Sequence, residues 1–305
     1  MKKVLVTGSS GFIAQHVIDE LLLHNTEVIG IDKEPYLKNP PKKYHKYCLD
    51  INSSELESIF KDHSIEYIIH LAANSSVPNS VKNPIEDAES NYLGSIRLCE
   101  LAKKYGVKRI LAASTAAVYA HPRYLPVKET HPPNCLSPYA ISKQAMEYYI
   151  TLSGVDYTIF RFSNVYGPGQ NNKGEAGVVA IFADAMGKNE DVKIYGDGEQ
   201  TRDFIYVKDV ARAIVEALLE KKCTNMIMNI SSNSSTTINE LYRIMKEHLG
   251  YKKEPIYLPQ RESDIRNSVL DNSLAKETFN FRPQIDLKTG LKETVKLINT
   301  TYERN

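Results

Sequence analysis

Near its N-terminus the chain reads Lys3-Val-Leu-Val-Thr7-Gly8-Ser-Ser-Gly11-Phe12-Ile13-Ala14. The apolar run predicts a short buried strand over residues 3–7, and the pattern after the glycines predicts a helix over 12–24. Gly8 and Gly11 permit a tight turn and let backbone N–H groups approach a diphosphate at the start of that helix, where the helix dipole favours negative charge. The spacing G-x-x-G-x-x-A is a variant of the dinucleotide-binding fingerprint, with Ala14 in the last small position. This stretch therefore predicts a nucleotide-binding α/β domain.

An acidic residue, Asp32, ends the next apolar segment, 24 residues beyond Gly8. A carboxylate in this position accepts hydrogen bonds from the adenosine ribose hydroxyls of a dinucleotide and repels a 2′-phosphate. We therefore expect NAD, and not NADP, as the cofactor. Lys33 follows directly and weakens the exclusion of NADP a little.

Short apolar strands alternate with helical patterns through the first half of the chain. Strands that are nearly continuous in Val, Ile and Leu and separated by helices are typical of a parallel sheet covered on both faces. The predicted strands are 3–7, 27–31, 44–49, 67–71, 109–113 and 157–162, and the predicted helices are 12–24, 54–61, 84–105 and 138–153. The sequence thus predicts a doubly wound parallel-sheet Rossmann domain.

The pattern changes after Phe162. A long irregular segment is expected over 164–177, a helix over 178–186 and a short strand near 192–195, before residues 204–207 and a helix over 209–220 return to the large domain. Helices near 238–249 and 287–300 complete a smaller mixed α/β C-terminal lobe. We therefore predict an NAD-binding domain of residues 1–164 plus about 201–222, and a substrate lobe of about 165–200 plus 223–305. A cleft between two such parts is a common place for a small-molecule site.

Tyr139 and Lys143 lie four residues apart in a segment that reads as a helix, with Ser137 as N-cap and Pro138 at the first helical position. Residues i and i+4 share a helix face. The unperturbed pKa of a tyrosine is about 10, and a lysine charge nearby lowers it toward the range of a general base. The pair is therefore the candidate for proton transfer, although taken alone such spacing also occurs on a solvated helix face.

Charge and composition exclude some classes of partner. The 305-residue chain carries a formal net charge of +1, so nothing draws it electrostatically to nucleic acid or a membrane surface. No apolar run approaches the ~20 residues that a membrane helix needs, and we expect a soluble, cytoplasmic protein. Its four cysteines show no C-x-x-C pairing, and we expect packing thiols and no metal site.

Read together, these motifs resemble the extended short-chain dehydrogenase/reductase superfamily and, within it, the NAD-dependent sugar-nucleotide epimerases and dehydratases. The resemblance covers nearly the whole chain. Further matching stretches are Leu49-Asp50-Ile51, His70-Leu71-Ala72-Ala73-Asn74, Asn91-Tyr-Leu-Gly-Ser95, Ser114-Thr115-Ala-Ala-Val-Tyr119, Arg161-Phe-Ser-Asn164-Val-Tyr-Gly-Pro-Gly, Gly196-Asp-Gly-Glu-Gln-Thr-Arg202-Asp-Phe and Arg261-Glu-Ser-Asp264. Ala14 and Ala120 stand where the family usually has glycine.

The resemblance implies roles for individual residues. Tyr139 would be the catalytic base, Lys143 would lower its pKa and bind the nicotinamide ribose, and Thr115 would hold the reacting hydroxyl. NAD would contact Gly8, Gly11, Phe12, Ile13, Asp32, Asp50, Ile51, Leu71, Ala72, Ala73, Asn91, Tyr139 and Lys143. A UDP-sugar would contact Thr115, Asn164, Val178, Arg202 and Arg261, with the arginines on its diphosphate. The family commonly dimerises through a four-helix bundle, here formed by 84–105 and 138–153.

Ala116 and Ala117 narrow the expected chemistry. By resemblance, sugar-nucleotide dehydratases and decarboxylases carry an acidic residue directly after the threonine, and alanines cannot act as acid or base. We therefore expect C4 epimerisation of a UDP-hexose, UDP-glucose/UDP-galactose or their N-acetylated forms, through a transient 4-keto sugar with tightly bound NAD. Alternatives are a sugar-nucleotide 4-ketoreductase, a UDP-glucuronate 4-epimerase and a non-catalytic dinucleotide-sensing protein. The sequence does not identify the hexose.

Overall fold

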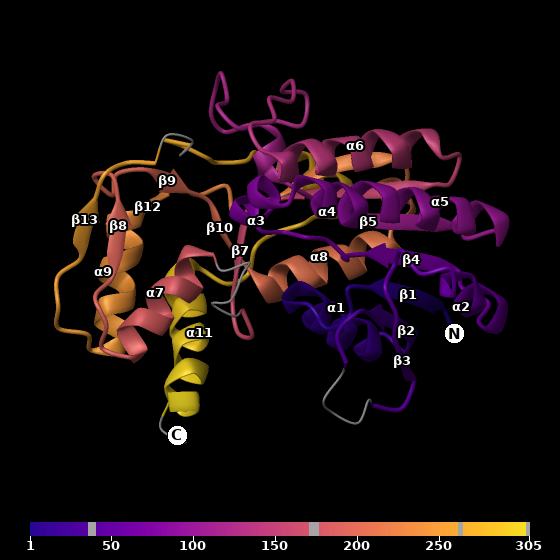
Figure 1. Ribbon diagram of the computed structural model, residues 1–305, viewed down its shortest axis with the longest axis horizontal. Coiled ribbons are helices and arrows are strands. Elements are labelled where there is room, and N and C mark those ends of the chain that lie inside the picture. Colours follow the sequence, from indigo (N-terminus) through magenta and orange to yellow (C-terminus); the bar gives the residue numbers. More distant parts are fainter. Residues whose placement is uncertain (36–40, 171–176, 262–264, 303–305) are drawn as a thin grey trace.

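The computed structural model describes residues 1–35, 41–170, 177–261 and 265–302. The large part of the molecule is built on a seven-stranded sheet in the order β11-β6-β5-β4-β1-β2-β3, and all its neighbouring strands are parallel (Figure 1). The strands are β1 (Lys3–Thr7), β2 (Glu27–Asp32), β3 (Tyr44–Cys48), β4 (Tyr67–His70), β5 (Arg109–Thr115), β6 (Tyr157–Phe162) and β11 (Met226–Ile230). The predicted Rossmann fold is therefore confirmed.

Alternate residues of β1 face two separate hydrophobic layers. Val4 and Val6 are buried with residues of α1 and α8, while Leu5 is buried with residues of α2, α5 and α6 on the other face. The helices are α1 (Phe12–Leu23), α2 (Leu56–Asp62), α3 (Val77–Lys82), α4 (Pro84–Ala88), α5 (Gly94–Lys104), α6 (Pro138–Leu152), α8 (Val207–Leu219) and α10 (Ser273–Phe279). Helices on both faces make every central strand a buried one, which explains their continuous apolar sequences.

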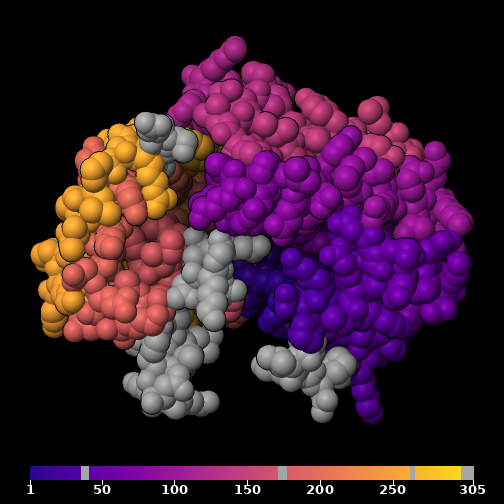
Figure 2. Space-filling model, in the orientation of Figure 1, coloured from indigo at the N-terminus to yellow at the C-terminus, as the bar shows by residue number. Residues whose placement is uncertain are grey.

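A smaller part lies beside the sheet domain and has its own hydrophobic core (Figure 1). It contains α7 (Val178–Gly187), α9 (Ile238–Leu249) and α11 (Leu287–Tyr302), with the strand pairs β8 (Lys193–Tyr195) with β13 (Ile256–Leu258) and β9 (Thr201–Arg202) with β12 (Thr236–Thr237). β7 (Asn164–Tyr166) pairs with β10 (Phe204–Tyr206). Figure 2 shows a hollow in the middle of this face, where N-terminal residues in indigo lie recessed between the two parts.

Two sequence predictions about chain organisation are wrong. Residues 223–305 were assigned to the small lobe, but β11 forms an edge of the large sheet and α10 packs against it. The segment 164–177 was expected to be irregular, but Asn164–Tyr166 forms β7, because its partner β10 is supplied by residues 40 positions later. The rest of that segment, at 171–176, lies outside the described residues.

The predicted helix over 84–105 is interrupted. Between α4 and α5 the chain forms a π-helical turn, η1 (Glu89–Leu93). Such a turn contains one extra residue and therefore changes the direction in which its side chains point, compared with a regular α-helix. Here it coincides with Asn91, which is fully buried. Among the described helices, none is long and apolar enough to cross a membrane.

Candidate active site

β1 and β4 are neighbours at the point where the strand order reverses, so their carboxyl ends lie together. This is the usual ligand position in doubly wound folds. Gly8 follows β1 with a φ of +68°, and a Cβ there would lie 2.7 Å from the backbone nitrogen of Ala72. Gly11 donates its N–H to Gly8 O at 2.9 Å and is the N-cap of α1. Only glycine fits this close approach at position 8. The glycine loop thus leads directly into the N-terminus of α1, where the sequence predicts a diphosphate.

Asp32 lies at the carboxyl end of β2 and is tied to the glycine loop. Its carboxylate accepts the backbone N–H of Ser10 at 2.8 Å and that of Glu34 at 2.9 Å. Lys46, from β3, donates to Ser10 Oγ. Burial lowers the pKa of Lys46, and the charge of Asp32 opposes that shift. The acidic group that sequence reasoning selected is therefore held beside the fingerprint.

A chain of buried hydrogen bonds supports the loop from below. Thr7 Oγ accepts the N–H groups of Leu71 and Ala72 and lies 2.8 Å from His70 Nδ1. His70 Nε2 lies 2.8 Å from Ser95 Oγ, which itself donates to a carbonyl at 2.5 Å. Because the Ser95 hydroxyl hydrogen is donated to that carbonyl, Nε2 must donate its hydrogen to Ser95 Oγ. The imidazole is therefore neutral with its proton on Nε2, and Nδ1 accepts from Thr7. Burial, assisted by the charge of Lys143, lowers the pKa of His70 to about 3.

The end of β5 presents Thr115 and Ser114 to opposite sides. Thr115 Oγ accepts the N–H of Ala117 at 3.1 Å and caps the 3-10 turn η2 (Ala116–Val118). Because the oxygen accepts that bond, its hydroxyl hydrogen can be donated to a ligand. Ser114 instead donates to the buried carboxylate of Glu147 on α6. Strand alternation predicts this separation.

Helix α6 carries the predicted proton-transfer pair and packs against β5 and η2. Ser137 caps it by accepting the N–H of Ala140 at 3.2 Å, and the backbone N–H of Tyr139 donates to Ser80 Oγ at 3.1 Å. The ammonium group of Lys143 is almost fully buried and donates to Ala113 O at 2.9 Å. Lys143 is thus fixed against the strand that ends in Thr115, on the helix that also carries Tyr139.

Asn91, which the sequence predicts to contact the cofactor, is hydrogen-bonded within the protein, and its contact with NAD stays a prediction. Its side chain is 0% exposed, and its Oδ1 accepts the N–H of Asn74 at 2.7 Å. Its Nδ2 donates to Asn74 O, to Asp87 Oδ1 and to Ser142 Oγ at 3.0–3.1 Å. The π-helical turn directs this amide inward, so Asn91 ties the loop after β4 to α6.

The other residues expected to contact NAD lie at the same edge of the sheet. Ile51 is buried against Gly94 of α5, and Asp50 Oδ1 accepts the N–H of Asn52 at 2.7 Å. Ile13 packs against the core beneath α1. The ring of Phe12 meets that of His16 edge-on, with centroids 5.9 Å apart.

Residues predicted to hold the substrate lie in or near the small lobe. Arg202 Nη1 donates to Thr201 O at 2.8 Å and to Ile265 O at 2.6 Å. The guanidinium carbon of the exposed Arg261 lies 3.7 Å from the ring centroid of Tyr195.

Two further predicted substrate residues stand at element ends. Asn164 begins β7, is exposed and donates its backbone N–H to Asp203 O at 2.8 Å. Val178 is the first residue of α7 and packs against the lobe core. Asp264, part of a matching motif, lies outside the described residues.

Sequence reasoning gave no role to His70, although it lies in a matching stretch, and did not single out Asp87, Ser142 or Glu147. Each is a buried polar residue whose partner comes from a distant element. Their only sequence signal is a polar residue at a position where helix or strand periodicity expects an apolar one.

Known proteins resemble this chain over nearly its whole length. The profile of the NAD-dependent epimerase/dehydratase family matches residues 4–231. A UDP-glucose 4-epimerase of Mycolicibacterium smegmatis is 36% identical, over 96% of this chain and 97% of its own. The crystal structure of a UDP-glucose 4-epimerase with UDP-glucose from Thermotoga maritima has a TM-score of 0.94 and 42% identity, covering 98% of this chain and 99% of that one. A UDP-N-acetylglucosamine 4-epimerase from Methanobrevibacter ruminantium has a TM-score of 0.92 and 35% identity, with coverages of 98% and 99%.

Proposed function

This chain belongs to the NAD-dependent epimerase/dehydratase family, and we propose that it inverts C4 of a UDP-hexose, interconverting UDP-glucose and UDP-galactose or their N-acetylated forms. One observation carries the choice among the family's reactions. Thr115 is followed by Ala116 and Ala117, which form the turn η2 beside it. The position next to the threonine therefore offers methyl groups where elimination or decarboxylation would need an acid or base.

The residues present fit the family cofactor, NAD. Gly8 lets the loop pack against the backbone of Ala72, where a Cβ would not fit, and Asp32 stands beside that loop, where it would meet the ribose hydroxyls. When bound, the cofactor would supply a reversible hydride acceptor for the reaction. The leading role of Asp32 is to discriminate against a 2′-phosphate by charge repulsion.

Tyr139 is the proposed base. Its phenolate takes the proton of the sugar 4-hydroxyl as the carbon is oxidised, and returns it when the carbon is reduced. Lys143 supplies a positive charge one helical turn away, and its bond to Ala113 O fixes the ammonium beside β5. Thr115 donates its hydroxyl hydrogen to the same sugar oxygen, since that hydrogen takes no part in the bond that Oγ accepts from Ala117 N–H.

Inversion requires the 4-keto sugar to present its second face before reduction. We assign anchoring of the diphosphate to Arg202 and Arg261, since guanidinium groups bind phosphate oxygens bidentately. The sugar can then turn while the nucleotide stays bound. Because oxidation and reduction balance, the cofactor is regenerated in each turnover and needs no exchange.

A homodimer accompanies this proposal. The helices predicted to form a four-helix bundle carry large apolar side chains in contact with solvent, including Ile85, Leu93, Ile141 and Leu152. An exposed apolar surface of this kind is typical of a protein interface. A second copy of the chain would cover it.

Substitution of the proposed base tests the function. We expect Tyr139→Phe to lower turnover of UDP-glucose or UDP-N-acetylglucosamine by at least about 100-fold while NAD stays bound, because only the proton-transfer group is lost. Tyr149→Phe is the matched control, since its hydroxyl lies on the same helix and donates to Glu100. Equal turnover in wild type and Tyr139→Phe would remove Tyr139 from this role. Stoichiometric consumption of NADH or NADPH would instead establish a reductase.

A further inference from the structure

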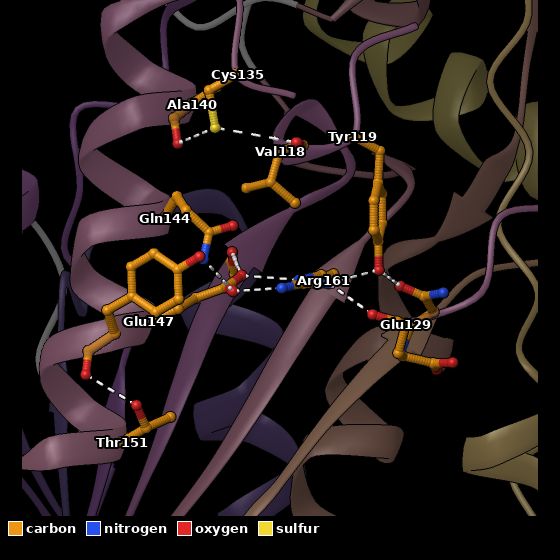
Figure 3. A network of polar contacts seen from close by, with 12 residues as sticks. Val118, Tyr119, Glu129, Cys135, Ala140, Gln144, Glu147, Thr151 and Arg161 are labelled. Atoms are coloured by element: carbon orange, nitrogen blue, oxygen red, sulfur yellow. Dashed lines mark hydrogen bonds and ion pairs between the residues drawn. The ribbon is translucent and has the colours of Figure 1, made fainter. Parts of the chain in front are cut away.

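A buried ion pair joins Glu147 of α6, the helix that carries Tyr139 and Lys143, to Arg161 of β6 (Figure 3). We propose that this pair is a positioning element that sets the placement of Tyr139 and Lys143 against Thr115. The proposal deepens the proposed function and rests on it for its kinetic part. Neither residue touches the reacting atoms in this account.

Glu147 is tied to two neighbouring strands at once. Its carboxylate accepts from Arg161 Nε at 3.0 Å and from Arg161 Nη2 at 2.6 Å, a bidentate contact. It also accepts from Ser114 Oγ and from Gln144 Nε2. Ser114 and Arg161 are direct neighbours across β5 and β6. A single carboxylate therefore fixes α6 over both strand ends.

The contacts of α6 occur on successive helical turns. Glu147 follows Lys143 by four residues, as Lys143 follows Tyr139. Lys143 donates to Ala113 O, and Glu147 accepts from the next residue of the strand, Ser114. Thr115 comes directly afterwards. Sliding or rotation of α6 by one contact would therefore move Tyr139 relative to the threonine.

The far side of Arg161 continues the network. Its Nη1 donates to Tyr119 Oη at 2.8 Å and to Glu129 O at 3.3 Å, and its guanidinium carbon lies 4.9 Å from the Tyr119 ring centroid. The Tyr119 hydroxyl in turn donates to Asn229 Oδ1 of β11 at 2.9 Å. Figure 3 shows Arg161 between Glu147 on one side and Tyr119 on the other. The segment after Thr115 is thus anchored by the same arginine.

A stabilising role alone does not explain such a pair. Removing two charges from water costs about as much free energy as their attraction returns. Replacing both partners by uncharged side chains therefore often leaves the unfolding free energy unchanged. Burial by itself would lower the pKa of Arg161, and the hydrogen bond and charge of Glu147 reverse that shift. What both charges provide together is a fixed geometry, which a pair of neutral side chains would not impose.

The test separates stability from turnover. Glu147→Gln and Arg161→Met each leave one buried charge without its partner, whereas the double variant leaves none. We expect both single variants to lose thermal stability and turnover. In the double variant the melting temperature should return toward the wild-type value, while kcat stays at least about tenfold low with KM for the UDP-hexose within about twofold.

Asp209→Asn is the matched control. Asp209 is also a buried carboxylate paired with an arginine, Arg212, but it binds the N–H groups of Gln284 and Ile285 far along the chain from α6. We expect this variant to lose stability and to keep its kcat. Recovery of kcat together with stability in the Glu147/Arg161 double variant would overturn the proposal. An unchanged kcat in Glu147→Gln, in Arg161→Met and in their double variant would also overturn it.

A second measurement does not depend on the proposed reaction. Hydrogen–deuterium exchange of the NAD-bound protein should be faster over residues 138–147 in the double variant than in wild type, with unchanged exchange in β1 and α1. If wild type fails to epimerise UDP-hexoses, the proposed function falls and this exchange result still decides the placement of α6. Equal exchange over 138–147 would contradict the positioning role.

Discussion

His70 provides a direct test of the buried network under the glycine loop. The unfolded side chain takes up a proton near pH 6.5, whereas burial holds the pKa of the folded side chain at about 3. Between these values the unfolded state binds more protons than the folded state. The stability contributed by neutral His70 is therefore complete above about pH 6.5 and is lost as the pH falls toward 3.

The size of the effect follows from the two pKa values. Each pH unit well below 6.5 costs about 1.4 kcal/mol for one proton, so lowering the pH from 7 to 5 removes about 2 kcal/mol of unfolding free energy. His70→Gln removes the titrating group but can still accept from Thr7 Oγ and donate to Ser95 Oγ. We therefore expect the unfolding free energy of wild type, measured relative to that of the variant, to fall by about 2 kcal/mol over that interval.

The assay is urea denaturation of both proteins at several pH values with saturating NAD. Comparison with the variant cancels the titration of all other groups, because those groups are the same in both chains. Parallel pH profiles of the two proteins would refute the assignment of a neutral, buried imidazole at this position.

Three further outcomes are expected. Gly8→Ala should reduce the amount of NAD retained on purification, because its Cβ would lie 2.7 Å from Ala72 N. The control is Gly106→Ala, also at positive φ but with no atom within 4 Å, which should cost about 1–2 kcal/mol of stability and keep NAD. Equal NAD content in the two variants would contradict this explanation. Asp32→Asn should shift the ratio of NADP to NAD affinity by about tenfold toward NADP, measured by titration calorimetry, since charge repulsion is removed; an unchanged ratio would assign the discrimination elsewhere. Leu152→Glu, at an 84% exposed residue, should convert a dimer to a monomer in light scattering, and a monomeric wild type would end the dimer proposal.

The parts of the fold that local sequence determines were predicted well. α6 begins at Pro138 after the cap Ser137, as Ser-Pro before an apolar pattern indicates. β2 ends at Asp32, where the apolar run ends. In each case the deciding interactions lie within a few residues along the chain.

The features that sequence missed depend on distant partners. Met226–Ile230 is a short, mostly apolar run that contains Asn229, and only its pairing with β6 shows that it belongs to the large sheet. The π-helical turn at Asn91 cannot be recognised from the apolar periodicity, because one extra residue shifts that pattern by less than one helical turn. Glu147 could be read as a surface charge until Arg161, from a strand fourteen residues later, was found opposite it.

The central claim is that one sugar carbon is oxidised and re-reduced by a cofactor that stays bound. The most direct test uses enzyme purified without added cofactor and UDP-glucose or UDP-N-acetylglucosamine deuterated at C4. We expect the C4 epimer to form with all of its deuterium retained and without consumption of added NADH. Loss of the label to solvent, or product formed only as NADH is consumed, would contradict the account.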